Sequence, residues 1–269
     1  MGLSDAALIK LRNLAVSLGL LDQARRAAKA LGIGMPPLAA FGGTLGDVPD
    51  AERNSTDLHR IYYANTGAQV CKWRGYLDVY DRHLRRFRGT KVRLLEIGVS
   101  RGGSLQVWRN YLGKDAVIFG IDVNPVCAGL GGDFAEVRIG SQSDAAFLRS
   151  VVGEMGGLDV VIDDGSHIAS HQRTSFETLF PLIDQSGVYI CEDAHSAYWR
   201  GPYEGGYRRR TSFIELCKDI VDDLHADFHG RAERLPHAHR TISGVHFYNS
   251  IIVIEKHPQS RPMYVAVPS

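Results

Sequence analysis

Two pairs of acidic residues stand where two apolar runs of the chain end. In the stretch DVVIDDGSHIASH an apolar run ends in Asp163 and Asp164, and His167 follows three residues later. In YICEDAHSAYW a second apolar run ends in Glu192 and Asp193. Carboxylates gathered in one partly buried place raise each other's pKa, and a divalent cation removes that penalty. The nearby donors are oxygens and not thiolates, so the expected ion is Mg²⁺, with Mn²⁺ as a substitute.

The histidines beside these carboxylates are candidate proton acceptors. If a substrate hydroxyl binds the metal, its proton becomes more acidic and His167 can remove it. His195 follows the second acidic pair and is a candidate second base or substrate donor. Successive strand side chains point to opposite faces, so we expect Asp163 and Asp164 to have different roles. A competing hypothesis is an oxygenase, in which His167, His195 and a carboxylate hold iron.

A glycine-rich turn, in LLEIGVSRGGSLQVW, follows an earlier predicted strand and precedes a predicted helix. Such a turn lets a ligand approach the backbone and meet a helix N-terminus. The spacing matches neither GxGxxG nor the tight GxGxG turn common in methyltransferases. The next strand ends in Asp122, about 20 residues on, where an acidic residue can hydrogen-bond a ribose diol. We therefore predict an adenosine-containing cofactor, with Asp122 and five residues of the turn as contacts: Gly98, Ser100, Gly102, Gly103 and Ser104.

Nicotinamide dinucleotide and S-adenosylmethionine both suit such a turn. Glu96, inside the strand before the turn, favours S-adenosylmethionine, because a carboxylate suits a cationic amino acid portion and would repel a pyrophosphate. Gln142, Ser143 and Asp144 follow the third predicted strand. These residues are expected either to face the adenine edge of the cofactor or to cap the next helix, and the sequence favours neither alternative.

The elements that must position these residues alternate along the chain. Short β-branched runs predict strands, and residues at helical spacing predict helices between them, which implies a parallel sheet covered on both faces. The predicted strands are 92–99, 116–123, 134–139, 158–163 and 187–191, and the predicted helices are 55–88, 103–112, 143–154 and 168–183. Residues 244–257 read as two strands joined only by Asn249 and Ser250, which indicates an antiparallel hairpin closing the sheet.

Composition and the N-terminal residues limit the possible partners, location and domain organisation of the protein. The formal net charge of +1 gives no field directed at nucleic acid or an anionic membrane. No apolar stretch approaches the roughly 18 residues of a spanning helix, and the N-terminus lacks the pattern of a signal peptide. The four cysteines form no CxxC pair, so we expect reduced thiols in a cytoplasmic protein. Residues 1–50 are expected to form a helical arm and linker, and 51–269 the catalytic domain.

Three segments resemble the metal-dependent sugar O-methyltransferases of natural-product and glycolipid pathways: LLEIGVSRGGSLQVW, VIDDGSHIASHQRTSFETLFP and EDAHSAYW. The resemblance covers roughly residues 70–257 and rests most on DDGSH and the ED pair. It implies a Rossmann-like class I methyltransferase sheet, mostly parallel with an antiparallel strand at the C-terminal end, using S-adenosylmethionine and magnesium. By motif match the metal ligands fall on Asp164, Glu192 and Asp193 and the base on His167, while Asp163 is assigned to the cofactor.

The acceptor is expected to be a glycoside, either a small molecule or an oligosaccharide. CKWRGYLDVYDRHL resembles a pocket segment of the family, which makes Lys72, Trp73 and Tyr76 substrate candidates. Tyr198 and Trp199 lie in a long loop, residues 195–212, that can cover a site and stack on a sugar. Phenols of the catechol type are alternative acceptors, and some family members carry a cephalosporin hydroxylase label. Family members often form oligomers, so a homo-oligomer is expected, and a non-catalytic subunit is the remaining alternative.

Overall fold

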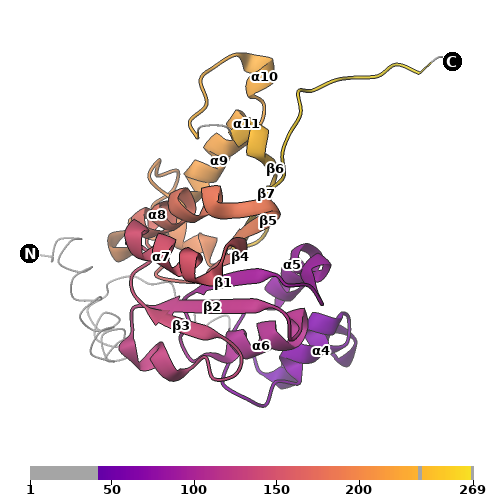
Figure 1. The fold of residues 1–269 in the computed structure, drawn as a ribbon, viewed down its shortest axis with the longest axis vertical. Coiled ribbons are helices and arrows are strands. Elements are labelled where there is room, and N and C mark those ends of the chain that lie inside the picture. The colour runs from indigo at the N-terminus through magenta and orange to yellow at the C-terminus, as the bar shows by residue number, and fades with distance from the viewer. Residues whose placement is uncertain (1–41, 236–237, 268–269) are drawn as a thin grey trace, which may run out of the picture.

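The computed structural model describes residues 42–235 and 238–267, and its centre is a seven-stranded sheet in the order β3-β2-β1-β4-β5-β7-β6 (Figure 1). Most of the predicted arm, residues 1–41, therefore lies outside the described residues. The strands are β1 (Arg93–Ile97), β2 (Val117–Asp122), β3 (Glu136–Ile139), β4 (Leu158–Asp163), β5 (Ile183–Cys191), β6 (Ile242–Phe247) and β7 (Ile252–Lys256).

The sheet is parallel from β3 to β5 and antiparallel where β7 joins β5 and β6. This confirms the predicted fold class. The strand order reverses between β1 and β4, and ligands of open α/β sheets bind at the carboxyl ends of strands at such a point. β5 begins at Ile183, four residues before the prediction. The β6–β7 link spans residues 248–251 and is longer than the predicted dipeptide.

Helices cover both faces of the sheet because successive strand residues point to opposite sides. The α-helices are α3 (Asp50–Arg53), α4 (Asp57–Tyr63), α5 (Arg74–Leu84), α6 (Gly103–Leu112), α7 (Ala145–Met155), α8 (Ala169–Leu179), α9 (Phe213–Asp223), α10 (Ala226–His229) and α11 (Ala238–Thr241). Leu94 packs in a core with α4, α5 and α6, whereas its neighbour Leu95 packs in a second core with α7, α8 and α9. Short 3₁₀ helices include η6 (Ala194–Tyr198) and η7 (Gly201–Tyr203). None of the helices in the described ranges has the length and apolar character needed to cross a bilayer.

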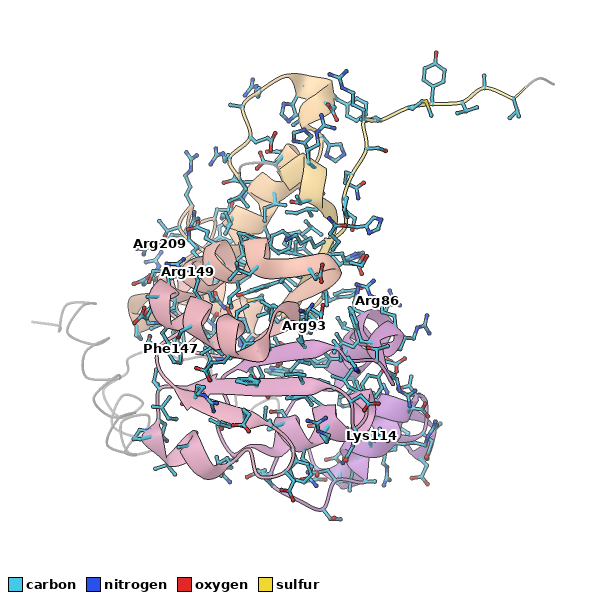
Figure 2. The ribbon with its side chains drawn as sticks, in the orientation of Figure 1. Arg86, Arg93, Lys114, Phe147, Arg149 and Arg209 are labelled. Atoms are coloured by element: carbon cyan, nitrogen blue, oxygen red, sulfur yellow. The ribbon has the colours of Figure 1, made fainter. Side chains whose placement is uncertain are left out.

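The amino ends of the central strands are tied together by one arginine. Arg93, labelled in Figure 2, donates to both oxygens of Asp159 at the start of β4 and to Asp184 at the start of β5. These contacts hold β1, β4 and β5 in register at the edge opposite to their carboxyl ends. The acidic residues that follow β4 and β5 are positioned from this fixed base.

The single helix predicted for residues 55–88 is wrong in its middle, because α4 and α5 are separated by residues 64–73. Asn65 and Gly67 break the helix in a turn, in which the Asn65 side chain accepts from the Gly67 amide and donates to the Ala68 carbonyl. The segment then crosses the start of α6. A Cβ on Gly103 would lie 2.4 Å from the carbonyl oxygen of Ala68, so only glycine admits this crossing. The crossing brings Lys72 to the carboxyl edge of the sheet.

The predicted long loop of residues 195–212 contains two short 3₁₀ helices, η6 and η7. The first of them begins one residue earlier, at Ala194. It ends at α9, a helix that the sequence reasoning did not identify. Ser212 caps α9 by accepting from the Glu215 amide, and its apolar side, including Phe213 and Ile220, is buried. The four cysteines are free, Cys71 exposed and the other three buried.

Candidate active site

The carboxyl ends of β1, β4 and β5 bring the two acidic pairs side by side. Asp163 is opposite Ile97 of β1 and Cys191 of β5 in the strand register. The Asp164 amide donates to the Ile97 carbonyl at 2.9 Å, and the Glu192 amide donates to the Asp163 carbonyl at 2.9 Å. The parallel ladder thus continues into the acidic residues and places them on one edge.

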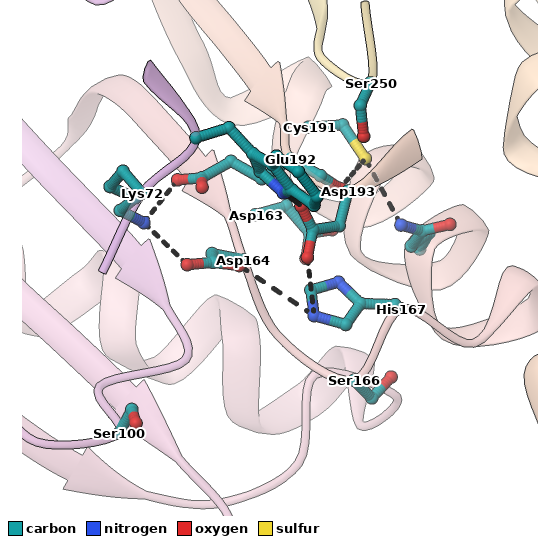
Figure 3. A network of polar contacts seen from close by, with 12 residues as sticks. Lys72, Ser100, Asp163, Asp164, Ser166, His167, Cys191, Glu192, Asp193 and Ser250 are labelled. Atoms are coloured by element: carbon teal, nitrogen blue, oxygen red, sulfur yellow. Dashed lines mark hydrogen bonds and ion pairs between the residues drawn. The ribbon is translucent and has the colours of Figure 1, made fainter. Parts of the chain in front are cut away.

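Three of the predicted residues form a close group of donor atoms: Asp164, His167 and Asp193, whose ligand atoms lie within 4.8 Å of one another. His167 Nε2 is 3.9 Å from Asp164 Oδ1 and 3.8 Å from Asp193 Oδ2 (Figure 3). His167 and Asp193 both have positive φ, at 56° and 49°. Such backbone costs about 1–3 kcal/mol per residue and is found where surrounding structure holds a functional side chain in place.

Glu192 faces away from this group, toward Lys72 and Tyr80. Lys72 Nζ lies 2.6 Å from Glu192 Oε1 and 2.6 Å from Asp164 Oδ2, and the Tyr80 hydroxyl also donates to Glu192. Burial and the Asp164 charge raise the pKa of Glu192, while Lys72 and Tyr80 oppose that shift. Burial alone would lower the pKa of Lys72, but attraction to Asp164, Glu192 and Glu96 raises it well above its usual value. One buried ammonium therefore offsets part of the negative charge of the acidic edge.

Asp193 is oriented by two side chains that the sequence placed near the site. Trp73 Nε1 and the Tyr76 hydroxyl donate to Asp193 Oδ1 at 3.0 and 2.9 Å. The other carboxylate oxygen, Oδ2, therefore faces His167. Trp73 and Tyr76 consequently hold a carboxylate in place, and the substrate contact predicted for them stays a prediction.

His195 does not join the donor group. Its Nδ1 contacts the hydroxyl of Ser250, and its ring packs edge-on against Trp73 and Trp199 at centroid distances of 5.8 and 4.6 Å. Burial lowers the pKa of His195, with Asp193 acting in the opposite direction. Trp199 in turn packs against Tyr203 at 5.1 Å, so an aromatic wall stands beside Asp193. Tyr198 is half exposed.

A pocket of about 280 Å³ opens beside Asp164 and the glycine turn. Gly98 has φ +97°, and a Cβ there would lie 2.1 Å from the Asp164 carbonyl oxygen, so the turn passes under the acidic loop only with glycine. The pocket is lined by Gln69, Val70, Cys71, Lys72, Gly98, Val99, Ser100, Arg101, Gly103, Ser104 and Asp164. Four of the five predicted turn contacts are among them; Gly102, φ +80°, is the N-cap of α6.

Glu96 and Asp122 organise the walls of this pocket from behind. Glu96 is fully buried and accepts from the Ser104 hydroxyl at 2.7 Å and from Trp108 Nε1 at 3.2 Å. Burial raises the pKa of Glu96, an effect that Lys72, Ser104 and Trp108 oppose. Asp122 Oδ2 accepts from the amides of Val99 and Ser100, both at 3.0 Å. The ribose contact of Asp122 stays a prediction.

Asp163 and Gln142 lie in the interior, behind the acidic loop. Asp163 is fully buried and accepts from Tyr189, Ser175 and Gln142 at 2.6, 2.7 and 3.0 Å. Burial raises its pKa, and these three donors oppose the shift. Gln142 Oε1 accepts from the Ser166 amide, next to His167, so this network holds the loop that carries the base. Ser143 is exposed and its amide donates to the Ser141 hydroxyl. Contacts of these three residues with a cofactor remain predictions.

Sequence reasoning missed Tyr80 and Ser250. Tyr80 is four residues after Tyr76 on α5, and this helical spacing places both hydroxyls on the face that meets the acidic edge. Ser250 lies in the β6–β7 link, with its hydroxyl oxygen 3.0 Å from the Tyr76 hydroxyl oxygen. No motif signals Ser250, because its position depends on the antiparallel return of β7 beside β5.

The chain has relatives among proteins of known activity and structure. No family model matches the chain. A curated relative, the 8-demethyl-8-(2-methoxy-alpha-L-rhamnosyl)-tetracenomycin-C 3′-O-methyltransferase of Streptomyces olivaceus, is 39% identical over 212 residues, which are 74% of this chain and 54% of the relative. The mycinamicin VI 2″-O-methyltransferase of Micromonospora griseorubida is 36% identical over 241 residues, or 83% of this chain and 58% of the relative. The chain thus spans about half the length of these curated relatives.

A solved structure gives the same relationship. The MycE methyltransferase of the mycinamycin biosynthetic pathway, in complex with Mg, SAH and mycinamycin VI, has a TM-score of 0.65 and 30% identity, covering 88% of this chain and 62% of its own. A second crystal form, with Mg and SAH, has a TM-score of 0.65 and 27% identity. The sequence identities and the shared fold agree with the resemblance carried by the DDGSH and ED motifs. This chain belongs to the family of class I, S-adenosylmethionine- and metal-dependent sugar O-methyltransferases.

Proposed function

We propose that this chain transfers the methyl group of S-adenosylmethionine to a sugar hydroxyl of a natural-product glycoside, with the help of a divalent cation. The observation that carries the proposal is the group of Asp164, His167 and Asp193 beside the pocket at the end of β1. The relatives' sugar O-methyltransferase activities and the Mg and SAH in the MycE complex support it.

The residues at the acidic edge fit a hard cation. Their carboxylate oxygens are the donors Mg²⁺ prefers, and His167 Nδ1 is buried without a hydrogen-bond partner among the described residues. Asp164 and Asp193 would hold the ion, and Glu192, here paired with Lys72, is the third predicted ligand. When bound, the cation supplies positive charge that makes a substrate hydroxyl more acidic.

His167 is the proposed general base. Its Nε2 accepts the hydroxyl proton, and Asp164 and Asp193, at 3.9 and 3.8 Å, stabilise the imidazolium that results. The hydroxyl oxygen attacks the methyl carbon; a C–O bond forms while the C–S bond breaks, giving a methyl ether and S-adenosylhomocysteine. The proton leaves His167 to solvent. His195, Trp199 and Tyr203 provide the aromatic wall for the sugar beside this position.

We also propose the wider organisation that the sequence suggests. Residues 51–269 would form the methyltransferase domain, and 1–50 an arm that packs on the body or on a second copy. The protein would act in the cytoplasm as a homo-oligomer. Light scattering of the full chain, and of a chain beginning at residue 51, measures whether the arm contributes to association.

The proposal is tested by methyl transfer from labelled S-adenosylmethionine to rhamnosylated and other deoxysugar glycosides, with and without EDTA. We expect activity to disappear in chelator and to fall by about 10²–10⁴-fold in His167→Ala. His225→Ala, at an exposed histidine outside the site, is the matched control. S-adenosylhomocysteine binding by calorimetry should survive in His167→Ala. Full activity in EDTA or in His167→Ala contradicts the mechanism, and transfer to catechols instead of glycosides contradicts the acceptor.

A further inference from the structure

A second group of metal-type donors lies outside the acidic edge, between α5 and the β6–β7 hairpin. His83 of α5, His246 of β6 and Glu255 of β7 bring ligand atoms within 4.8 Å of one another. Glu255 Oε1 lies 3.0 Å from His83 Nδ1, and Glu255 Oε2 lies 3.5 Å from His246 Nε2. One carboxylate therefore stands between two imidazoles, and none of these residues belongs to the site described above.

The strand register shows why His246 and Glu255 share a face. His246 is opposite Val253, two residues before Glu255, and Val253 packs in the core on the α5 side. Gly244 is opposite Glu255. A Cβ on Gly244 would lie 3.1 Å from His246 Nε2, so the glycine leaves the space into which the imidazole reaches.

His246 Nε2 is the unexplained atom of the group. It is buried and has no hydrogen-bond partner among the described residues. A buried ring nitrogen without a partner costs free energy, so each such atom calls for a physical explanation. A bound cation beside Glu255 would provide it.

His83 is already oriented as a ligand would be. Its side chain is only 4% exposed, and its Nε2 contacts the Tyr248 hydroxyl at 2.9 Å. In metal sites the second ring nitrogen of a histidine ligand is usually held in this way, which leaves the first nitrogen for the ion. Here that nitrogen is Nδ1, and it faces Glu255.

The spacing of the donors suits a small tetrahedral ion. With metal–ligand bonds of about 2.1 Å, donors of a tetrahedral site are about 3.4 Å apart. Each imidazole nitrogen lies near that distance from one carboxylate oxygen: His83 Nδ1 is 3.0 Å from Glu255 Oε1, and His246 Nε2 is 3.5 Å from Glu255 Oε2. Two imidazoles and one carboxylate form a set typical of zinc and of other first-row transition metals, unlike the oxygen-rich acidic edge.

Two arginines lie near this donor group, and neither prevents a cation from binding there. Arg86 Nη1 lies 3.5 Å from Glu255 Oε1, but the Arg86 side chain is 44% exposed and can turn to solvent. Arg82 packs over the Tyr248 ring, outside the donor group.

We propose that His83, His246 and Glu255 bind a zinc-class transition-metal ion that ties α5 to the C-terminal hairpin. Because α5 also carries Tyr76 and Tyr80, such an ion would brace the helix that orients Asp193 and Glu192.

The test uses the untagged full chain, stripped with EDTA and dialysed. Zn²⁺ binding is measured by calorimetry and by the rise in melting temperature, and Co²⁺ binding by its visible absorption. The ligand variants are His246→Gln and Glu255→Gln, and the matched control is His225→Gln at an exposed histidine. Asp193→Asn separates this site from the acidic edge. Circular dichroism of the metal-free variants confirms that each is folded.

We expect the wild-type chain, His225→Gln and Asp193→Asn to bind Zn²⁺ at this site and to be stabilised by it. The ligand variants should lose more affinity than the roughly 10–100-fold typical of outer-shell changes, and Tyr248→Phe should lose about that amount. No Zn²⁺ binding by the wild type overturns the proposal. So does a number of bound Zn²⁺ ions per chain that is unchanged in His246→Gln and Glu255→Gln, or that falls in Asp193→Asn alone.

Discussion

Lys72 and Asp164 are 92 residues apart in the chain and form an ion pair, with Lys72 Nζ 2.6 Å from Asp164 Oδ2. The same ammonium lies 2.6 Å from Glu192, so it joins the residues that follow β4 and β5. The segment between α4 and α5 thereby supplies a positive charge that offsets part of the negative charge of the sheet edge. A cation bound by the same carboxylates would compete with this ammonium.

Lys72→Met should destabilise the metal-free protein. Removing one partner of a buried ion pair costs about 3–5 kcal/mol, because the remaining charge is left uncompensated. Denaturant unfolding in EDTA measures the loss, and Lys91→Met, at an exposed lysine, is the control. Added Mg²⁺ should restore more stability to Lys72→Met than it adds to the wild type. Equal unfolding of the two lysine variants in EDTA would show that the ion pair contributes nothing.

Gly98→Ala should damage both stability and cofactor binding. Its φ of +97° costs an L-residue about 1–2 kcal/mol, and the new Cβ would lie 2.1 Å from the Asp164 carbonyl oxygen, forcing the acidic loop to move. Gly153→Ala in α7 is the matched control, because nothing lies within 4 Å of its added Cβ. That control should gain about 0.5–1 kcal/mol in unfolding free energy. S-adenosylhomocysteine affinity that is equal in both variants would contradict the proposed role of the turn.

Tyr80→Phe should leave Glu192 with one donor fewer. A buried acceptor that loses its partner costs about 1–3 kcal/mol, and the Tyr80 hydroxyl is fully buried against Glu192. Tyr111→Phe removes a comparable bond, from Tyr111 to Asp81 at 2.7 Å, away from the acidic edge. Both variants should unfold at lower denaturant concentration than the wild type. Only Tyr80→Phe should change the Mg²⁺ concentration needed for methyl transfer; the same change in Tyr111→Phe would count against a specific role.

Cys71 should react with iodoacetamide at pH 8.5 far faster than the other cysteines. It is exposed and lines the pocket beside the glycine turn, whereas Cys127, Cys191 and Cys217 are buried. S-adenosylhomocysteine should slow the reaction if it binds in that pocket. Peptide mass spectrometry measures the adduct, and Cys71→Ser should lack the fast phase. Unchanged labelling at saturating S-adenosylhomocysteine would place the cofactor elsewhere.

Cys127 should make stability fall at alkaline pH. Burial, and then Asp122, raises the pKa of its thiol from 9.0 to about 12. The folded chain therefore keeps a proton that the unfolded chain loses, so this contribution is present below pH 9.0 and is lost as pH rises toward about 12. Unfolding free energies of the wild type and Cys127→Ala, compared across that range, should converge. A constant difference would show that the thiol does not titrate in this way.

Local patterns in the sequence were enough to predict the sheet, its C-terminal hairpin and the position of the two acidic pairs at strand ends. The apolar run of β4 ends at Asp163, and that of β5 ends just before Glu192. Side chains buried on both faces of a parallel strand are mostly apolar, and polar residues begin where the strand leaves the core. The glycine turn was visible for a similar reason, since Gly98 is required by a backbone conformation that few other residues adopt.

Only the tertiary structure decided which of these side chains meet. It paired Glu192 with Lys72 and Tyr80, enclosed Asp163 in the interior, and grouped Asp164 with His167 and Asp193. Strand alternation predicts which face a residue takes, but partners more than 90 residues apart are set by how α5 and the hairpin pack on the sheet. The chemistry of each residue is local to the sequence, whereas the charge balance of the site is a property of the packed fold.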